Sequence, residues 1–340
     1  MAFITFHPKD HFKTKTYSGN SGTQNITGIG FQPDMVWTKK RDGTDDHNIF
    51  DVVRGVTKEI RPNKSDYEDT ASNGLTAFGT DGYTIGDWGL MNQGHTYVSW
   101  NWKAANSQGS SNTDGSINTT YTSANTTAGF SISKFTVTGS TATVGHGLGV
   151  APKWILVKTL ANAGAWQMYH ASIGPTKYAE FHTNAFATSS GRWNDTAPTS
   201  SVFTISNEWS NGRVLIAYCF AEKTGFSKFG SYVGNGNADG AFVYTGFKPA
   251  WILWKATDGE GWYLYDTGRN RYNGLGNLLR PDVANADYNY AISEGVLPMS
   301  NGFKVLGSSG WHGTNAQEYI YMAFAEHPWI GDGSSPVPAK

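Results

Sequence analysis

Cysteine and charge are both scarce in this sequence. Its 340 residues include one cysteine, Cys219, which excludes an intramolecular disulfide and a cysteine-based zinc site. Charged residues make up 16% of the chain, below the usual share of about a quarter, and the formal net charge is −1. No basic field exists to attract nucleic acid or an anionic membrane. We therefore expect neither of these as a partner.

Long apolar runs, heptad patterns and common catalytic motifs are also missing. No transmembrane run or basic leader is visible, so we expect synthesis in a cytoplasm and no membrane insertion. The sequence has no Gly-x-Ser-x-Gly elbow, no phosphate-binding glycine loop and no His-Glu-x-x-His motif. We expect no enzymatic activity, no cofactor and no metal.

Glycine and aromatic residues are abundant instead. There are 41 glycines, aromatic residues reach 14%, and serine, threonine and asparagine are frequent. This composition is typical of short strands and tight turns rather than helices. The sequence therefore predicts an all-β fold.

One segment occurs three times. Residues 33–39 (Pro-Asp-Met-Val-Trp-Thr-Lys), 152–158 (Pro-Lys-Trp-Ile-Leu-Val-Lys) and 249–255 (Pro-Ala-Trp-Ile-Leu-Trp-Lys) each join a proline to an apolar run and a closing lysine. Proline suits the start of a strand because it cannot donate to the ladder, and the continuous apolar run indicates burial on both faces. Pro33, Pro152 and Pro249 are thus predicted to begin three equivalent central strands.

The copies continue beyond these strands. Matching segments follow at 48–51, 166–170 and 262–266, and each copy closes on an alternating aromatic strand that ends at Trp102, Phe220 or Phe324. Spans of near-equal length favour one supersecondary unit copied in tandem. We predict three related β-sandwich-like units at 1–104, 105–223 and 224–328, packed side by side, with a C-terminal arm at 329–340. An arrangement about a pseudo-threefold axis is one option. Residues 104–129 are interpreted as an ordered, polar strand-turn-strand entry to the second unit, because residues 117–123 include β-favouring types.

Several longer motifs resemble a known family. They are residues 30–39, 50–55, 143–153, 218–222 with 228–232, and 323–329. Together they are similar to a repeated module in virion proteins of tailed bacteriophages, which are usually described as tail-fibre-like or structural.

The resemblance implies location in a virion and other virion proteins as partners, and it implies no catalytic residues. The expected function is that of a structural accessory protein on tail or capsid that contacts the host surface or the virion. Two alternatives stay open: a capsid decoration or knob protein, and a polysaccharide depolymerase. The oligomeric state is also open.

The repeated polar residues have a structural interpretation. Lys39, Lys158 and Lys255 close the three strands, where a lysine usually reaches into solvent or pairs with a carboxylate; a ring of the three lysines is the alternative. On this basis Lys158→Ala is expected to have little effect. The pairs Asp51–Arg54 and Asp266–Arg269 share one spacing, which favours an ion pair that braces a turn over a ligand grip.

Other polar residues give weaker indications. Asp42, Asp45 and Asp46 could offer oxygens to Ca²⁺, but their spacing lacks the EF-hand pattern. His146 lies between glycines and suits a backbone-capping role, and Cys219 suits a small core position. Glu180, Glu208 and Asp195 are the carboxylates from which a glycosidase pair could be drawn.

Tryptophans outside the predicted strands are the binding candidates. They lie among glycine, asparagine, aspartate and histidine, and they are Trp88, Trp193, Trp209 and Trp311. Aromatic faces beside amides and carboxylates suit sugar rings, so a host-surface glycan is a candidate ligand. The alternative is that these side chains close the ends of the sandwiches or pack one unit on the next.

Overall fold

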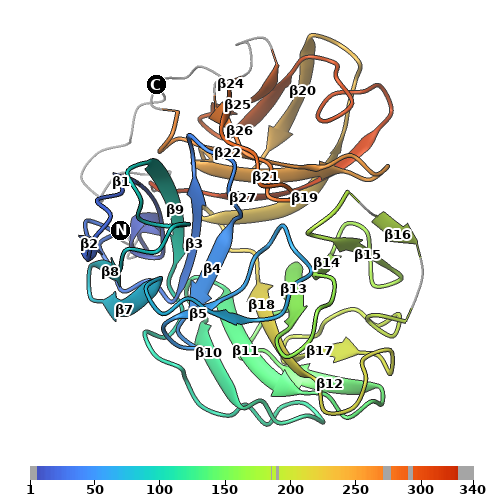
Figure 1. Cartoon of the computed structure of the whole chain (residues 1–340). Helices are drawn as coiled ribbons and strands as arrows, with labels where there is room; N and C mark the ends of the chain where they lie inside the picture. The colour runs from blue at the N-terminus through green and yellow to red at the C-terminus, as the bar shows by residue number, and fades with distance from the viewer. Residues whose placement is uncertain (1–5, 185, 189–190, 271–276, 290–293, 328–340) are drawn as a thin grey trace, which may run out of the picture.

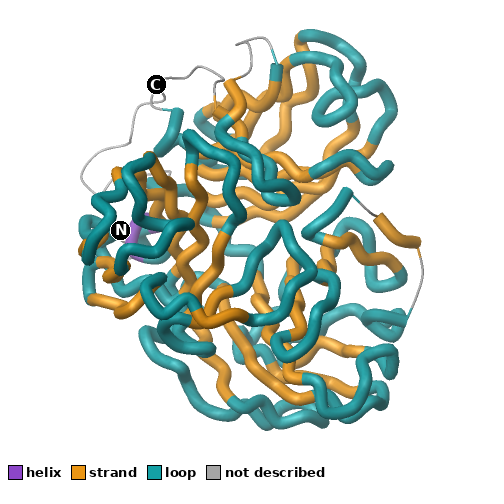
Figure 2. The backbone as a smooth tube through the Cα atoms, viewed as in Figure 1, coloured by secondary structure: helices purple, strands orange, loops and turns teal. Residues whose placement is uncertain are grey.

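The computed structural model describes residues 6–184, 186–188, 191–270, 277–289 and 294–327 as antiparallel β-structure (Figures 1 and 2). The predicted all-β class is confirmed, and the helix in the described ranges is one short 3₁₀ turn, η1 (Pro8–Asp10). The predicted C-terminal arm at 329–340 lies outside the described residues.

Three large sheets share a strand order. The first sheet has the order β1-β9-β3-β4, and the third has β19-β27-β21-β22. The second contains the corresponding run β11-β18-β13-β14, extended by β10 at one edge and by β15 and β16 at the other. The bounds of these strands are β1 (Phe12–Ser18), β3 (Met35–Lys40), β4 (Asn48–Asp51), β9 (Thr96–Trp102), β10 (Tyr121–Asn125), β11 (Phe130–Thr136), β13 (Trp154–Thr159), β14 (Gln167–His170), β15 (Lys177–Glu180), β16 (Phe186–Thr188), β18 (Val214–Phe220), β19 (Ser227–Val233), β21 (Trp251–Ala256), β22 (Trp262–Asp266) and β27 (Glu318–Phe324).

Smaller sheets cover the outer faces of the large ones. Their orders are β2-β8-β7, β12-β17 and β20-β26-β25, and two short strand pairs, β5-β6 and β23-β24, come directly after β4 and β22 in the chain. The bounds are β2 (Gln24–Ile26), β5 (Lys58–Glu59), β6 (Asp69–Thr70), β7 (Leu75–Gly79), β8 (Gly82–Ile85), β12 (Ala142–Gly145), β17 (Val202–Ile205), β20 (Asp239–Tyr244), β23 (Asn277–Leu278), β24 (Tyr288–Asn289), β25 (Gly295–Met299) and β26 (Gly302–Leu306). Each large sheet and its small sheet enclose a hydrophobic cluster, as in a β-sandwich.

The repeated proline segments form the central strands β3, β13 and β21. Each strand begins two residues after its proline and pairs on both sides, β3 with β4 and β9, β13 with β14 and β18, and β21 with β22 and β27. Every residue of the three strands is buried, as the continuous apolar runs indicated. The prolines are buried just outside the ladder, where a missing N–H costs no strand pairing.

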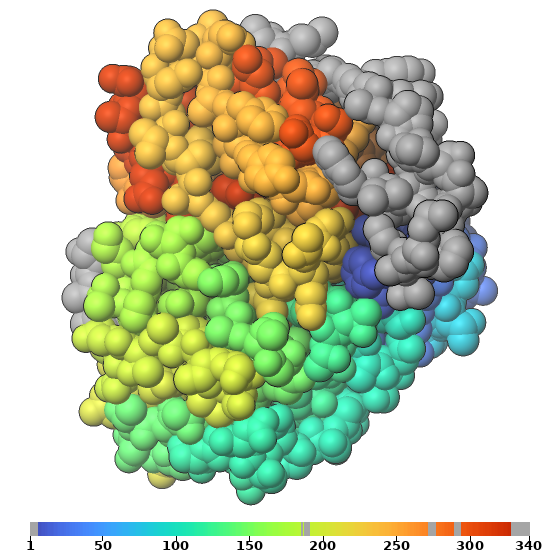
Figure 3. Space-filling view, turned by 180° about the vertical axis from the view of Figure 1, so that it is seen from behind, coloured from blue at the N-terminus to red at the C-terminus, as the bar shows by residue number. Residues whose placement is uncertain are grey.

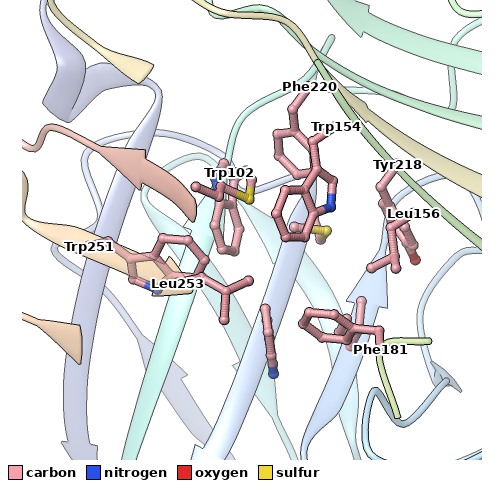
Figure 4. A pocket seen from close by; sticks show the side chains of 12 residues that line it. Trp102, Trp154, Leu156, Phe181, Tyr218, Phe220, Trp251 and Leu253 are labelled. Atoms are coloured by element: carbon pink, nitrogen blue, oxygen red, sulfur yellow. The ribbon is translucent and has the colours of Figure 1, made fainter. Parts of the chain in front are cut away.

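The inner faces of the large sheets meet in a shared aromatic core. One cluster takes side chains from all three sheets, and its members include the closing triplets Val98/Trp100/Trp102, Ile216/Tyr218/Phe220 and Ile320/Met322/Phe324. Figure 4 shows Trp102, Trp154 and Trp251, one from each sheet, turned toward the same region. The space-filling view in Figure 3 shows the second part of the chain (green to yellow) and the third (orange to red) in contact along one continuous surface.

The entry to the second sheet differs from its predicted bounds. The β-favouring residues 117–123 predicted a strand there, yet β10 covers Tyr121–Asn125. Ile117 instead forms an isolated parallel bridge with Val144 of β12. It thereby covers the β12 edge of the two-stranded sheet β12-β17, which is opposite to the edge that carries a third strand in the first and third small sheets.

Replacing Trp251 by alanine should strongly destabilise the protein. Its side chain is 0% exposed and contacts Phe12 and Trp102 of the first sheet as well as Phe324. Loss of a buried aromatic side chain typically costs about 3–5 kcal/mol. Urea denaturation should show this loss for Trp251→Ala and for Trp154→Ala, whereas Val233→Ala, at an exposed strand end, should stay near wild type. A wild-type midpoint for Trp251→Ala would contradict this description of the core.

Candidate functional site

The three strand-closing lysines lie inside the protein. Lys39, Lys158 and Lys255 are each 0% exposed, so the expectation that they reach into solvent is wrong. The reason is the alternation of the strand: two residues before each lysine stands Trp37, Leu156 or Leu253, which points into the shared core. The lysines therefore extend the same inward-facing rows at one end of that core.

Backbone carbonyls bind the buried ammonium groups. Lys158 Nζ donates to the carbonyls of Ser65, at 2.9 Å, and Gly164, at 2.5 Å. Lys255 Nζ donates to those of Asn184, at 2.9 Å, and Glu260. Ser65 lies between β5 and β6, in the connection from β4 to β9 of the first large sheet, and Asn184 lies between β15 and β16. Lys158 thus binds the second sheet to a loop of the first, and Lys255 binds the third sheet to a loop of the second.

Lys39 is held within its own turn. Its ammonium donates to the carbonyls of Lys40, at 2.6 Å, and Gly43, at 3.2 Å. Burial lowers the pKa of all three lysines, to about 8 in each case. Lys158 and Lys255 therefore connect neighbouring sheets, whereas Lys39 closes a turn of its own sheet.

Aromatic N–H groups connect the same segments. Trp166 Nε1 donates to the Arg61 carbonyl at 2.8 Å, and Trp262 Nε1 donates to the Glu180 carbonyl at 3.2 Å. The first of these bonds joins the second sheet to the connection between β4 and β9 of the first sheet. The second joins the third sheet to the end of β15.

His47 makes the third connection of this kind. Its Nδ1 accepts from Trp37 Nε1 at 3.1 Å, which leaves Nε2 to donate to the Arg280 carbonyl at 3.2 Å. Burial lowers the pKa of His47 well below its ordinary value and keeps the ring neutral. The bond joins the first sheet to the connection between β22 and β27 of the third. Each pair of large sheets is therefore bridged.

The predicted Asp–Arg pairs are buried and bridge sheets as well. Arg54 pairs with Asp51 and Arg269 pairs with Asp266, and all four side chains are 0% exposed. Each aspartate also accepts the backbone N–H of its arginine, at 2.8 Å and 2.9 Å, which closes the turn after the strand.

Each aspartate accepts a further bond from another sheet. Tyr218 Oη donates to Asp51 Oδ2 at 2.7 Å, and Trp100 Nε1 donates to Asp266 Oδ2 at 3.0 Å. The second sheet has His170 at this place, and its Nε2 contacts the Tyr321 carbonyl of the third sheet at 3.2 Å. Neither ion pair is open to a ligand, because solvent reaches neither.

These bridging partners were not singled out from the sequence. His47, Trp100 and Tyr218 act across the sheets, and nothing in their spacing identifies the carbonyl or carboxylate that they contact. The matched positions of His47, Trp166 and Trp262 in the repeat were the one available indication.

Two of the four tryptophans proposed to bind sugar are in the interior. Trp193 is 3% exposed and packs edge-on against Tyr169, and Trp209 is 6% exposed beneath the Arg192 guanidinium. The sugar-binding interpretation is wrong for these two because a buried ring offers no face to a ligand.

The other two tryptophans are half-buried against the outer cores. Trp88 lies edge-on to Phe50, with ring centroids 6.0 Å apart. Trp311 lies 4.8 Å from the ring of Tyr263, and its carbonyl accepts from Trp254 Nε1 at 2.9 Å. This is the packing alternative that the sequence left open.

The acidic loop does not form a metal site. Asp42 contacts His95 at 3.1 Å, Asp45 pairs with Lys40, and Asp46 pairs with Arg61 at 3.5 Å, so the three carboxylates have different partners. Within the described residues no three histidine, cysteine, aspartate or glutamate side chains converge where an ion could be held.

The candidate glycosidase carboxylates also have separate neighbours. Glu208 pairs with Arg192 at 2.9 Å, and Glu180 lies 3.9 Å from His182. Asp195 occupies a left-handed backbone position, with φ 48°. Two of the three carboxylates thus have ionisable partners of their own.

Cys219 and His146 are buried. Burial raises the pKa of the Cys219 thiol. His146 Nδ1 accepts the backbone N–H of Leu148 at 3.1 Å, which fits the capping role expected from its flanking glycines.

A small apolar cavity lies in the shared core. Its volume is about 20 Å³, and it is lined by Met35, Trp37, Ile49, Trp102, Trp154, Leu156, Phe181, Tyr218, Phe220, Trp251, Leu253 and Met322. Space of this size holds about one water molecule at most. The side chains drawn in Figure 4 surround this space, whose volume is too small for a substrate.

The fold and its interior bonds define an all-β protein of packed antiparallel sheets. Residues 7–328 match the model of a family described as a domain of unknown function, DUF7483. The match covers most of the chain, which therefore belongs to this family. No curated protein and no solved structure matches the chain. None of the helices in the described ranges has the length and apolar content that crossing a membrane takes.

The buried lysines should make stability depend on pH. An unfolded lysine titrates near pH 10.4, so between about pH 8 and about pH 10 the unfolded chain binds more protons than the folded one. The lysine contribution to the free energy of unfolding therefore rises with pH across this window. Cys219 acts in the opposite direction, because its raised pKa retains a proton in the folded state.

A variant isolates the lysine contribution. Lys158→Met removes one of three titrating groups and should remove about a third of that contribution, read from urea denaturation at several pH values. Lys228→Met, at a partly exposed ammonium paired with Glu222, is the control and should keep the wild-type slope. Identical slopes for Lys158→Met and wild type would show that Lys158 does not titrate in this window.

Removing one partner of a buried ion pair should be costly. Asp51→Ala leaves the Arg54 guanidinium without its carboxylate and Tyr218 without an acceptor, with an expected loss of about 3–5 kcal/mol. Glu222→Ala breaks a partly exposed pair and should cost less than about 1 kcal/mol. Equal melting curves for the two variants would contradict a bridging role for Asp51.

Proposed function

We propose that this protein is a structural accessory protein of a tailed-phage virion, displayed on tail or capsid. The motif resemblance supplies the virion setting. The observation that carries the structural role is the use of the buried ionisable groups: Lys158, Lys255, Asp51, Asp266 and His170 all take part in bonds between sheets. These groups thus connect the sheets, which supports a structural role for them over a place in a reactive cleft.

We also propose that the chain is built from three tandem, related sandwich units around a pseudo-threefold axis. The shared strand order of the large sheets supports this proposal. The bonds of Trp166, Trp262 and His47 give further support. They connect the second unit to the first, the third to the second and the first to the third, so the three units are bonded in a closed cycle. Such a body is rigid and leaves its outer faces free for contacts.

The packed sheets and their buried ionisable groups favour a protein that acts by binding other surfaces and not by catalysis. The protein would bind neighbouring virion proteins and present its outer loops and small sheets to the host surface. An all-β scaffold with a packed interior suits recognition, because the interior packing does not constrain the side chains that face outward.

Purified virions test the location. For a phage that encodes this chain, peptides of the protein should co-purify with virions through a density gradient, and immunogold labelling should mark either the tail or the capsid. A chain found in the lysate but absent from gradient-purified particles would overturn the proposal. Capsid labelling with unchanged host adsorption of a deletion phage would favour the decoration role.

Catalysis is tested separately. The pure protein, incubated with host envelope polysaccharide, should release no reducing ends over time. A steady release that Glu180→Gln or Glu208→Gln abolishes would replace the structural role by a depolymerase.

A further inference from the structure

The outward face of the small sheet β20-β26-β25 carries exposed apolar side chains. Phe242 is 49% exposed, Tyr244 is 65% exposed and Met299 is 40% exposed. The intervening Val243 points the other way, into the core between this sheet and the third large sheet. Figure 1 shows β20 at the outer edge of the molecule, away from the other two large sheets.

The strand register brings these side chains into two neighbouring rows. Tyr244 pairs with Gly302, which pairs with Met299, and in the next row Phe242 pairs with Lys304, which pairs with Leu297. Gly302 has no side chain, and a Cβ there would lie 2.9 Å from Phe242 Cζ. The tip of the Phe242 ring therefore covers the glycine, and Tyr244 and Met299 stand on either side of it.

The sheet β2-β8-β7 shows that the fold does not require this surface. It has the same strand order, and Ile26 and Tyr83 fill its inward positions as Val243 and Phe303 do here. Its outward row, however, is Asn25, Thr84 and Ala77. The matching positions of β2-β8-β7 thus carry small or polar side chains, and the exposed aromatic residues on β20 are specific to the third small sheet.

The size and edges of the face argue against a protein partner. A stable protein interface takes about 20–30 residues on each side, far more than the few apolar side chains here. Strand addition is hindered as well: Pro298 lacks an N–H in the edge strand β25, and β20 has a register shift between Asp239 and Phe242.

A sugar ring fits the chemistry of the face. Its C–H face stacks on aromatic rings, while its hydroxyl groups need charged or amide partners at the rim. Lys304 lies beside Phe242 and pairs with Asp239, whose side chain is 84% exposed. An ammonium thus lies beside the Phe242 ring with a carboxylate paired to it, and both groups can bind hydroxyl groups.

We propose that the outward face of β20, β26 and β25 binds a saccharide, which stacks on Phe242 and Tyr244 and bonds to Lys304 and Asp239. The inference rests on the proposed function for its setting, as contact with glycan on the host surface. It moves the glycan site from the tryptophans at 88, 193, 209 and 311 to a different set of residues.

Saturation-transfer difference NMR on the full-length protein tests the site. The probes are tetrasaccharides of glucose, mannose, galactose and N-acetylglucosamine. At least one should bind, with transfer strongest to the C–H protons of one ring face. The double variant Phe242→Ala/Tyr244→Ala should weaken that binding about tenfold or more, because both stacking rings are lost. The matched control Asn25→Ala/Thr84→Ala on β2-β8-β7 should bind like wild type, and thermal melts establish that both variants fold.

Three results would overturn the proposal: no binding of any of the four probes by the wild type, undiminished binding by the folded double variant, or a wild-type dimer that the double variant converts to a monomer. The last result would make the face an interface between copies. Failure here is distinct from failure of the proposed function. A chain that is absent from virions can still bind the probes, and a virion protein can fail to bind them.

Discussion

Burial of both faces of the large sheets is the constraint on which the rest of the structure depends. A strand buried on one face can turn its polar residues to water, but β3, β13 and β21 have no such face. The lysine that closes each repeated segment is therefore inside, and its ammonium must find protein acceptors. For Lys158 and Lys255 those acceptors include the carbonyls of Ser65 and Asn184, which lie in loops of a neighbouring sheet.

The same requirement explains why the conspicuous ionisable residues are structural. A buried ion pair adds little net stability compared with an apolar pair, yet removing one partner is strongly destabilising. Asp51 and Asp266 each bind an arginine on their own turn and a ring donor from another sheet, so each fixes both a turn and a junction. Recognition then depends on the outer surface. Phe242 and Asn25 occupy matching outward positions on β20 and β2, and the exposed aromatic ring at only one of them indicates a role other than folding.

Much of the fold could be predicted from the sequence. The three proline segments identified the central strands, and the alternating triplets that end at Trp102, Phe220 and Phe324 identified side chains that share one face of each closing strand, all of which lie in the shared core. These patterns are local, because the alternation of side chains along a strand acts over a few residues. The site was predicted less well: Lys158 was expected at the surface and Trp193 in a binding loop, and both are buried.

The sequence by itself determined which segments form strands and which side chains share a face of a strand. Only the tertiary structure decided which faces stay exposed, because exposure depends on the sheet that packs opposite, and that sheet comes from a distant part of the chain. Alternation places Lys158 on the same face as Leu156, but the other two sheets decide that this face is buried. Alternation likewise sets Phe242 and Tyr244 opposite to Val243, and they stay accessible because no other described element covers them.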